Sequence, residues 1–132
     1  MTLNTPSILV VDDELLIRDL LYDFFHGHGW DIAIAEDGEK ALQILQSRKI
    51  DLVLTDIRMP QMDGLTLTSE MQQSYPDIPV VLMTGYPSVD SAVTALRCRV
   101  TDYITKPFNI NKLYKVIQTK VQEKETGFDG DD

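Results

Sequence analysis

Acidic side chains stand directly after two apolar segments of the sequence. Asp12 and Asp13 follow the run SILVV, and Asp56 follows LVLT. Two later segments are followed by other polar groups, Thr84 after VVLM and Lys106 after DYIT. Crowded carboxylates repel one another and have raised pKa values unless a divalent cation keeps them ionised. Because hard oxygen ligands in a hydrated site suit Mg²⁺, the sequence predicts a magnesium site at this cluster.

Each of these polar residues also has an explanation that involves no chemistry. Asp12 could cap a helix, and Asp56 could form a turn. Thr84 could end a strand, and Lys106 could be a surface lysine. Asp13 makes a capping role for Asp12 less favourable, because adjacent carboxylates at a buried strand end are costly without a cation.

The segments that carry these residues have the patterns of strands and helices in alternation. Residues 7–11, 51–55 and 80–83 are continuous apolar runs rich in β-branched residues, typical of parallel strands buried on both faces. Residues 31–35 are less bulky and predict a strand at or near an edge, and residues 102–105 predict a fifth strand.

Helical stripes of apolar residues fall between these strands. Each stripe could cover one face of a sheet; their members are Leu16, Ile17, Leu20, Leu21 and Phe24, then Val89, Ala92, Val93 and Leu96, and finally Leu113, Val116, Ile117 and Val121. Gly27 and Gly29 are expected to end the first helix, and Asp37 and Asn109 to cap two others. A further helix is expected after Gly64, despite poor helix formers, because two parallel strands need a crossover there.

Five β-α units in a row predict an α/β fold with a doubly wound parallel sheet and helices on both faces. In such a sheet, ligands bind at the carboxyl ends of the strands, near the point where the strand order reverses. The four polar clusters at those ends are therefore expected to converge on one crevice.

Composition limits the remaining possibilities. A chain of 132 residues with 43% hydrophobic content suits one compact domain, expected at residues 1–122, followed by an acidic tail or linker stub at 123–132. The net charge of -9 disfavours direct binding of nucleic acid or anionic lipid. The single Cys98 and the absence of an apolar run of membrane-spanning length favour a cytoplasmic protein. No histidine or cysteine spacing suits zinc, since His26 and His28 flank a glycine at an expected helix end.

The motifs VVDDE, DIRMPQMDG, TG after an apolar strand, and DYITKPF occur in this order. Together they resemble the receiver domain of bacterial two-component response regulators, the CheY-like superfamily, over roughly residues 7–122. The resemblance implies a flavodoxin-like (β/α)5 fold with strand order 2-1-3-4-5. It also implies a phosphorylation-dependent signalling switch that works with Mg²⁺ and is not an enzyme acting on other substrates.

Roles for individual residues follow from the resemblance. Asp56 would accept a phosphoryl group from a sensor histidine kinase or a phosphotransfer protein. Asp13, Asp56 and the main-chain carbonyl of Arg58 would hold Mg²⁺, and Asp12 would act mostly through a bound water. Thr84 and Lys106 would contact phosphoryl oxygens; the latter supplies a fixed positive charge.

The resemblance also implies how the signal leaves the site. Tyr103 would be a switch aromatic that turns inward when Thr84 moves, changing the face formed by the fourth helix, fifth strand and fifth helix. That face would bind a partner or a second copy of the chain. The receiver could belong to a longer transcriptional regulator or hybrid kinase, and the sequence names neither the kinase nor the output.

Two other classes of protein share part of this pattern. A haloacid-dehalogenase-like hydrolase also forms an aspartyl phosphate, but it needs a second aspartate two residues after the nucleophile, where Arg58 stands. A flavodoxin-like module for a nucleotide or flavin needs a phosphate-binding loop after the first strand, where the sequence has DDELL. Turnover of a phosphate ester would favour the first, and a bound chromophore the second.

Overall fold

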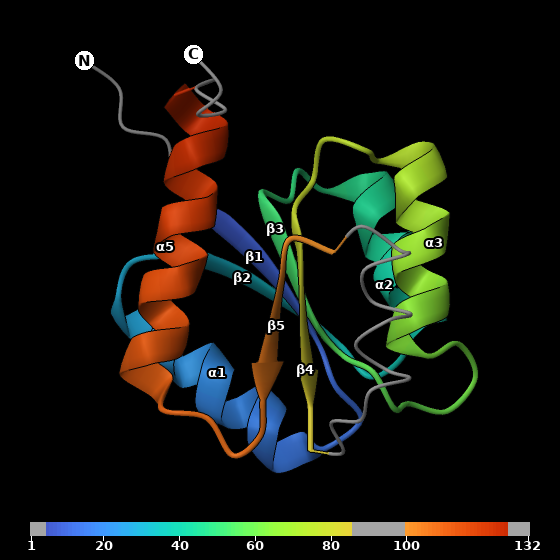
Figure 1. Cartoon of the computed structure of the whole chain (residues 1–132), viewed down its shortest axis with the longest axis horizontal. Coiled ribbons are helices and arrows are strands. Elements are labelled where there is room, and N and C mark those ends of the chain that lie inside the picture. Colours follow the sequence, from blue (N-terminus) through green and yellow to red (C-terminus); the bar gives the residue numbers. More distant parts are fainter. Residues whose placement is uncertain (1–4, 86–99, 127–132) are drawn as a thin grey trace.

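The computed structural model describes residues 5–85 and 100–126 as a parallel sheet between two layers of helices (Figure 1). The strands are β1 (Ser7–Val11), β2 (Asp31–Ala35), β3 (Leu52–Asp56), β4 (Val80–Thr84) and β5 (Asp102–Thr105). The helices are α1 (Leu15–Gly27), α2 (Gly38–Ser47), α3 (Gly64–Ser74) and α5 (Ile110–Thr126). The strand order is β2-β1-β3-β4-β5 and every pairing is parallel, which confirms the predicted sheet and the edge position of β2.

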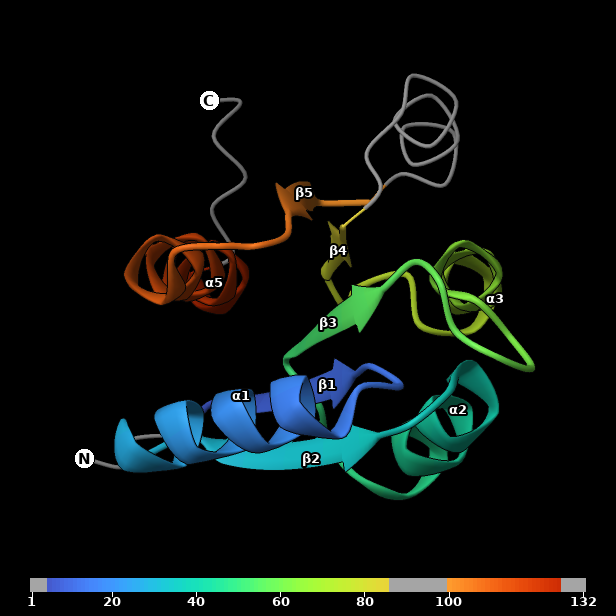
Figure 2. The same ribbon diagram turned by 90° about the horizontal axis from the view of Figure 1, so that it is seen from below.

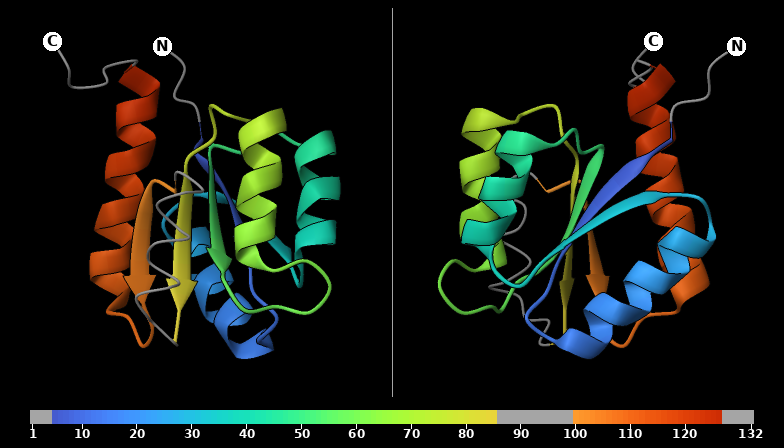
Figure 3. Two further views of the ribbon diagram at one scale, coloured as in Figure 1. Left: turned by 45° about the vertical axis from the view of Figure 1, so that its right-hand side comes forward. Right: turned by 180° about the vertical axis from the view of Figure 1, so that it is seen from behind.

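Successive strand residues point to opposite faces, so the sheet separates two apolar cores. Leu9, Val11 and Val53 face α2 and α3, and Ile8 and Val10 face α1 and α5. Figure 2 shows these two pairs of helices on opposite sides of the sheet, and Figure 3 shows α2 and α3 running side by side. The central strands are buried on both faces, which explains their continuous apolar runs.

The predicted helix ends are largely confirmed. The Asp37 side chain accepts from the Lys40 backbone N–H at 2.9 Å, and Asn109 Oδ1 accepts from the N–H of residues 111 and 112. Helix α1 ends at Gly27, and Gly29 has a φ of 83° that favours glycine. The helix expected after Gly64 is present, and Asp63 caps it by accepting from the Thr66 backbone N–H at 2.8 Å.

The apolar stripe predicted for α1 is partly wrong. Leu16 is 81% exposed and Leu20 is 49% exposed, whereas Leu21 and Phe25 are fully buried. The buried pair is spaced by four residues. At about 100° per residue, Leu20 lies roughly 120° around the helix from the direction of this pair, and Leu16 lies roughly 160° from it. The predicted stripe contains five apolar residues, and packing of α1 against the sheet buries only some of them.

Other differences concern element ends and the extent of the described chain. β3 includes Asp56 as its last residue, because the strand is paired as far as Met83 of β4. Helix α5 continues to Thr126, past residue 122 where the domain was expected to end. The expected helix containing Val89, Ala92, Val93 and Leu96 lies outside the described residues, as does the tail from residue 127 onward. Among the described helices, none is long and apolar enough to cross a membrane.

Candidate acidic site at the strand ends

The polar residues singled out in the sequence meet at one edge of the sheet. Asp12 comes directly after β1, Asp56 and Thr84 are the last residues of β3 and β4, and Lys106 follows β5. Parallel pairing places these ends together, as in the alignment of Asp56 with Met83 and of Thr84 with Thr105. The predicted convergence of four strand ends on one site is confirmed.

Three carboxylates form a set that could hold a cation. Asp12, Asp13 and Asp56 each offer a ligand oxygen, and these oxygens lie within 4.8 Å of one another. The first and last are buried, and Asp13 is exposed. One oxygen of Asp12 accepts from the Glu14 backbone N–H at 2.9 Å, which orients this carboxylate. A set of hard oxygen donors with one side open to water fits Mg²⁺, which retains several waters in proteins.

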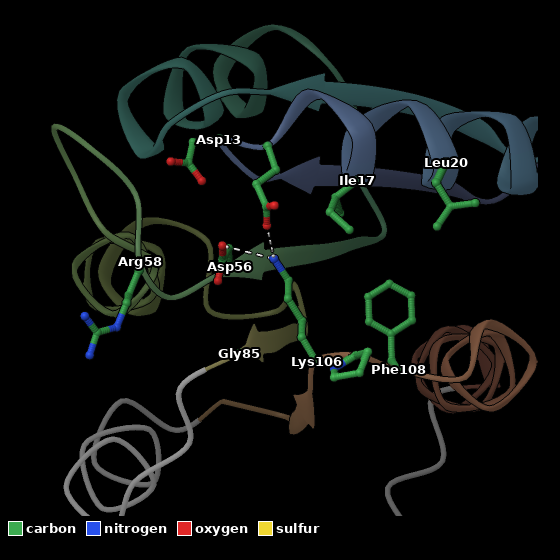
Figure 4. Close-up of a pocket in the computed structure, with 10 residues that line it drawn as sticks. Asp13, Ile17, Leu20, Asp56, Arg58, Gly85, Lys106 and Phe108 are labelled. Carbon is green, nitrogen blue, oxygen red and sulfur yellow. Dashed lines mark hydrogen bonds and ion pairs between the residues drawn. The ribbon is translucent and has the colours of Figure 1, made fainter.

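Lys106 lies among the acids. Its Nζ is 2.8 Å from Asp12 Oδ2 and 3.3 Å from Glu14 Oε1. It is also 3.2 Å from Asp56 Oδ2, a contact drawn as a dashed line in Figure 4. Its backbone is fixed as well, because its N–H donates to the carbonyl of Thr84 at 2.7 Å. Lys106 is therefore held at the site both by its backbone hydrogen bond and by the contacts of its ammonium group.

The charged groups have shifted pKa values with identifiable causes. Burial raises the pKa of Asp12 above 3.8, and the hydrogen bond from Lys106 opposes that rise. Burial also raises the pKa of Asp56, followed by the nearby charge of Asp12, again against the effect of Lys106. Burial acts to lower the pKa of Lys106, but the hydrogen bond and charge of Asp12 and the charge of Asp56 outweigh it and raise the pKa. Lys106 thus remains an ammonium. Its single positive charge does not fully offset the burial of the Asp12 and Asp56 carboxylates, so the pKa values of both acids stay raised.

The loop after β3 is held against the site by a glycine. The Gly64 N–H donates to the Ile57 carbonyl at 2.8 Å, and a Cβ at residue 64 would overlap the carbonyl oxygen of Asp56. Only glycine allows this close approach of α3 to the backbone of the candidate phosphoacceptor position. Within the same loop, Gln61 has a φ of 66°, a conformation that L-residues adopt at a cost.

The acids open into a hollow of about 690 Å³. On its far wall, Ile17 and Leu20 of α1 point toward Phe108, while Asp13 and Asp56 lie on the other side (Figure 4). The hollow thus combines an acidic, lysine-bearing wall with an apolar one. The sequence did not predict this apolar wall, because Ile17 and Leu20 belong to α1 whereas Phe108 follows β5, and only the fold brings these two segments together.

The remaining predicted residues are placed as follows. Thr84 is 1% exposed at the end of β4, so its side chain lies within the fold rather than in solvent. Arg58 lines the hollow with an exposed side chain that points away from Asp56 (Figure 4). Tyr103 is half-buried in β5, as expected, and among the described residues its buried hydroxyl has no hydrogen-bond partner. Glu14, for which the sequence analysis predicted no role, is a direct partner of Lys106.

Comparison with known proteins gives a consistent result. The family model described as the response regulator receiver domain matches residues 8–118. The regulatory protein AtoC of Escherichia coli K12 is 42% identical over 115 residues, covering 87% of this chain and 25% of its own length. The transcriptional regulatory protein ZraR of E. coli O157:H7 is 39% identical over 118 residues, covering 89% of this chain and 27% of its own length. The chain therefore spans about a quarter of the length of these relatives.

Solved structures match over nearly the whole chain. A CheY-like response regulator receiver domain protein from Methanospirillum hungatei has a TM-score of 0.90 at 29% identity, covering 94% of this chain and 99% of its own. NtrX from Brucella abortus, solved in complex with ADP, has a TM-score of 0.86 at 33% identity, covering 94% of this chain and 29% of its own.

Proposed function

This chain belongs to the response regulator receiver domain family, whose members are phosphorylation-dependent signalling switches, and we propose that Asp56 is its phosphoacceptor. A carboxylate oxygen of Asp56 attacks phosphorus and forms the new O–P bond. With a phosphohistidine, the P–N bond breaks and the imidazole nitrogen takes a proton from solvent. With a small acyl phosphate, the P–O bond breaks and the carboxylate leaves as an anion without taking a proton. The observation that carries this proposal is the position of Asp56, 3.2 Å from the Lys106 ammonium at the strand ends.

The neighbouring groups have proposed roles that follow from their charges. Asp13, Asp56 and the Arg58 carbonyl would hold Mg²⁺, with Asp12 contributing through water. When bound, the ion neutralises charge that develops on the phosphoryl oxygens. Lys106 supplies a fixed positive charge to one oxygen, and Thr84 donates a hydrogen bond to another.

Phosphorylation makes the site more negative by about one charge. We propose that this change draws Thr84 toward the phosphoryl group and favours an inward position of Tyr103. The buried hydroxyl of Tyr103, without a hydrogen-bond partner among the described residues, supports an aromatic that is not tied to one position. The face formed by β5, α5 and the expected fourth helix would then bind a partner or a second copy; that fourth helix lies outside the described residues.

The proposed role is regulatory, with no turnover of external substrates. A hydrolase of the haloacid-dehalogenase type is not supported, because the match over residues 8–118 is to receiver domains and Arg58 replaces the second aspartate. A flavin or nucleotide module is disfavoured by Asp13 and Glu14, since acids at the start of α1 would repel a phosphate.

The proposed function also implies partners and a larger context for this chain. We propose that this chain is cytoplasmic and that a sensor histidine kinase or a phosphotransfer protein donates the phosphoryl group. The relatives AtoC and ZraR are regulatory proteins about four times as long as the matched segment, which supports residues 1–122 as the receiver part of a larger transcriptional regulator. In that arrangement, residues 123–132 would join the receiver to its effector, and DNA contact would not involve this acidic segment.

Intact-mass measurement tests the central proposal. The protein is incubated with Mg²⁺ and acetyl phosphate, beside an Asp56→Asn variant and an exposed-acid control, Glu70→Gln. A single phosphoryl adduct is expected on the wild type and on the control, and none on Asp56→Asn. An adduct of equal yield on Asp56→Asn would show that another residue accepts the group, and the absence of any adduct would contradict the proposed chemistry with small donors.

A further inference from the structure

Glu14 contacts the lysine of the acidic site from the solvent side. Its Oε1 lies 3.3 Å from Lys106 Nζ, and its side chain is 62% exposed, whereas the Lys106 side chain is 12% exposed. The other two acceptors of the ammonium, Asp12 and Asp56, have side chains that are 0% and 10% exposed. Glu14 also lines the hollow through which a phosphodonor would approach.

The backbone position of Glu14 makes this contact notable. Glu14 is the N-cap residue of α1, with extended dihedral angles and no side-chain capping hydrogen bond. N-caps favour short side chains such as Ser, Thr, Asp and Asn, which accept from the first backbone N–H groups of the helix. Here the longer side chain reaches away from the helix end to Lys106 instead.

The contact with Glu14 reduces the positive charge that Lys106 can present to an incoming anion. A lysine has three N–H donors, and three carboxylates surround this one. When Asp56 carries a phosphoryl group, a phosphoryl oxygen can replace the Asp56 oxygen as an acceptor. Asp12 and Glu14 would then still share the ammonium, so Glu14 places a negative charge within a few ångströms of the new anion.

We propose that Glu14 is a positioning residue that competes with phosphoryl groups for Lys106, so that the site disfavours doubly charged phosphodonors. The inference rests on the proposed function of Asp56 and assigns Glu14 a role through Lys106 rather than contact with the reacting atoms. The donor class that Glu14 admits best is one of low negative charge at the transferred group, or one presented with compensating positive charge.

Two small donors of different charge test the proposal. At neutral pH acetyl phosphate is a dianion, whereas phosphoramidate carries a net charge of about -1. Initial rates of adduct formation are measured by intact mass, with Mg²⁺, for wild type, Glu14→Gln and the control Glu70→Gln. Each rate is measured at low and at high ionic strength, and urea unfolding of each variant reports that it is folded.

Removal of the Glu14 charge is expected to raise the rate with acetyl phosphate about threefold at low salt, the size expected for one unit charge near a charged donor at an exposed position. The gain with phosphoramidate should be smaller, and both gains should shrink at high salt because exposed charges are screened. The control should behave as the wild type. A merely structural role of Glu14 would change both donors alike and would not depend on salt.

The outcomes separate this inference from the proposed function. Equal rates for wild type and Glu14→Gln, or a loss of rate that is the same with both donors, would overturn the competition and leave Asp56 as the phosphoacceptor. No adduct on any of the three proteins with either donor would overturn the proposed function and the role of Glu14 with it.

Discussion

Replacing Gly64 by alanine should destabilise the protein and slow phosphorylation of Asp56. A Cβ at this position would overlap the Asp56 carbonyl oxygen and would lie 3.0 Å from the carbonyl carbon of Asp56 and from Cα of Ile57. All three are backbone atoms, so no side-chain rotation can relieve the overlap. The start of α3 must shift away from β3, and the hydrogen bond from the Gly64 N–H to the Ile57 carbonyl must lengthen or break.

The magnitude follows from these changes. Overpacking of a well-packed interior costs typically about 1–3 kcal/mol. Loss of the 2.8 Å hydrogen bond adds about 1 kcal/mol, and the better helix propensity of alanine offsets up to about 1 kcal/mol. The last two terms nearly cancel, so the net loss of unfolding free energy should be about 1–3 kcal/mol, a large share of the stability of a small domain.

Urea unfolding followed by tryptophan fluorescence measures this loss. Trp30 is the only tryptophan and is 6% exposed, with its indole N–H donating to the Tyr114 hydroxyl, so unfolding changes its environment. The midpoint for Gly64→Ala should fall by about 1–2 M. The matched control is Gly27→Ala in α1, where a Cβ meets nothing within 4 Å and stability should be kept or slightly raised. A loss below about 0.5 kcal/mol for Gly64→Ala would refute the reasoning from close approach.

Three further changes test other parts of the structure. Because the pKa of Asp56 is raised above 3.8, the folded state binds more protons than the unfolded state just above that pH. In Mg²⁺-free buffer, Asp56→Asn should therefore gain stability over the wild type as the pH rises from 3.8 to neutrality, and Mg²⁺ should stabilise only the wild type strongly. Gln61→Gly should raise the unfolding free energy by about 0.5–1 kcal/mol, since Gln61 has a φ of 66°. Leu21→Ala should cost about 2–5 kcal/mol, whereas Leu16→Ala, at a side chain 81% exposed, should change stability by less than about 0.5 kcal/mol. Urea unfolding measures all three, with pH and Mg²⁺ varied for the first.

Each of these predictions has a contrary result. A pH-independent difference between Asp56→Asn and the wild type would mean that Lys106 fully compensates the buried charge. A loss of stability in Gln61→Gly would mean that the side chain of Gln61 contributes more than its backbone conformation costs. Similar losses for the two leucine variants would contradict the orientation of α1.

The site was predictable from the sequence because it depends on strand ends. Four segments of recognisable strand pattern each lead into a polar residue, and parallel pairing places such ends at one edge. The order of the strands came with the family resemblance rather than from the patterns, since several orders would bury the same apolar runs. The caps at Asp37 and Asn109 were also visible, because capping depends on local sequence.

What the sequence did not predict depends on contacts between distant segments. The rotation of α1 is set by packing on the sheet, which buries Leu21 and Phe25 and leaves Leu16 exposed. The need for glycine at residue 64 arises from the backbone of Asp56, which only the folded chain brings near. The contact of Glu14 with Lys106 joins residues 92 positions apart, and no local pattern distinguishes it from an ordinary acidic helix start.

The position of Lys106 also bears on how a switch of this kind could work. In the unphosphorylated chain the ammonium already has three carboxylate partners, so phosphorylation would exchange one acceptor for another rather than create a contact in an empty place. The difference in free energy between the two arrangements is then a small difference between large electrostatic terms. A phosphoryl group can shift a conformational equilibrium only by its differential interaction with the two states. The proposed equilibrium between two conformations must therefore be nearly balanced before phosphorylation. The electrostatic interaction of a single exposed charge beside the site, such as that of Glu14, is then large enough to shift this equilibrium.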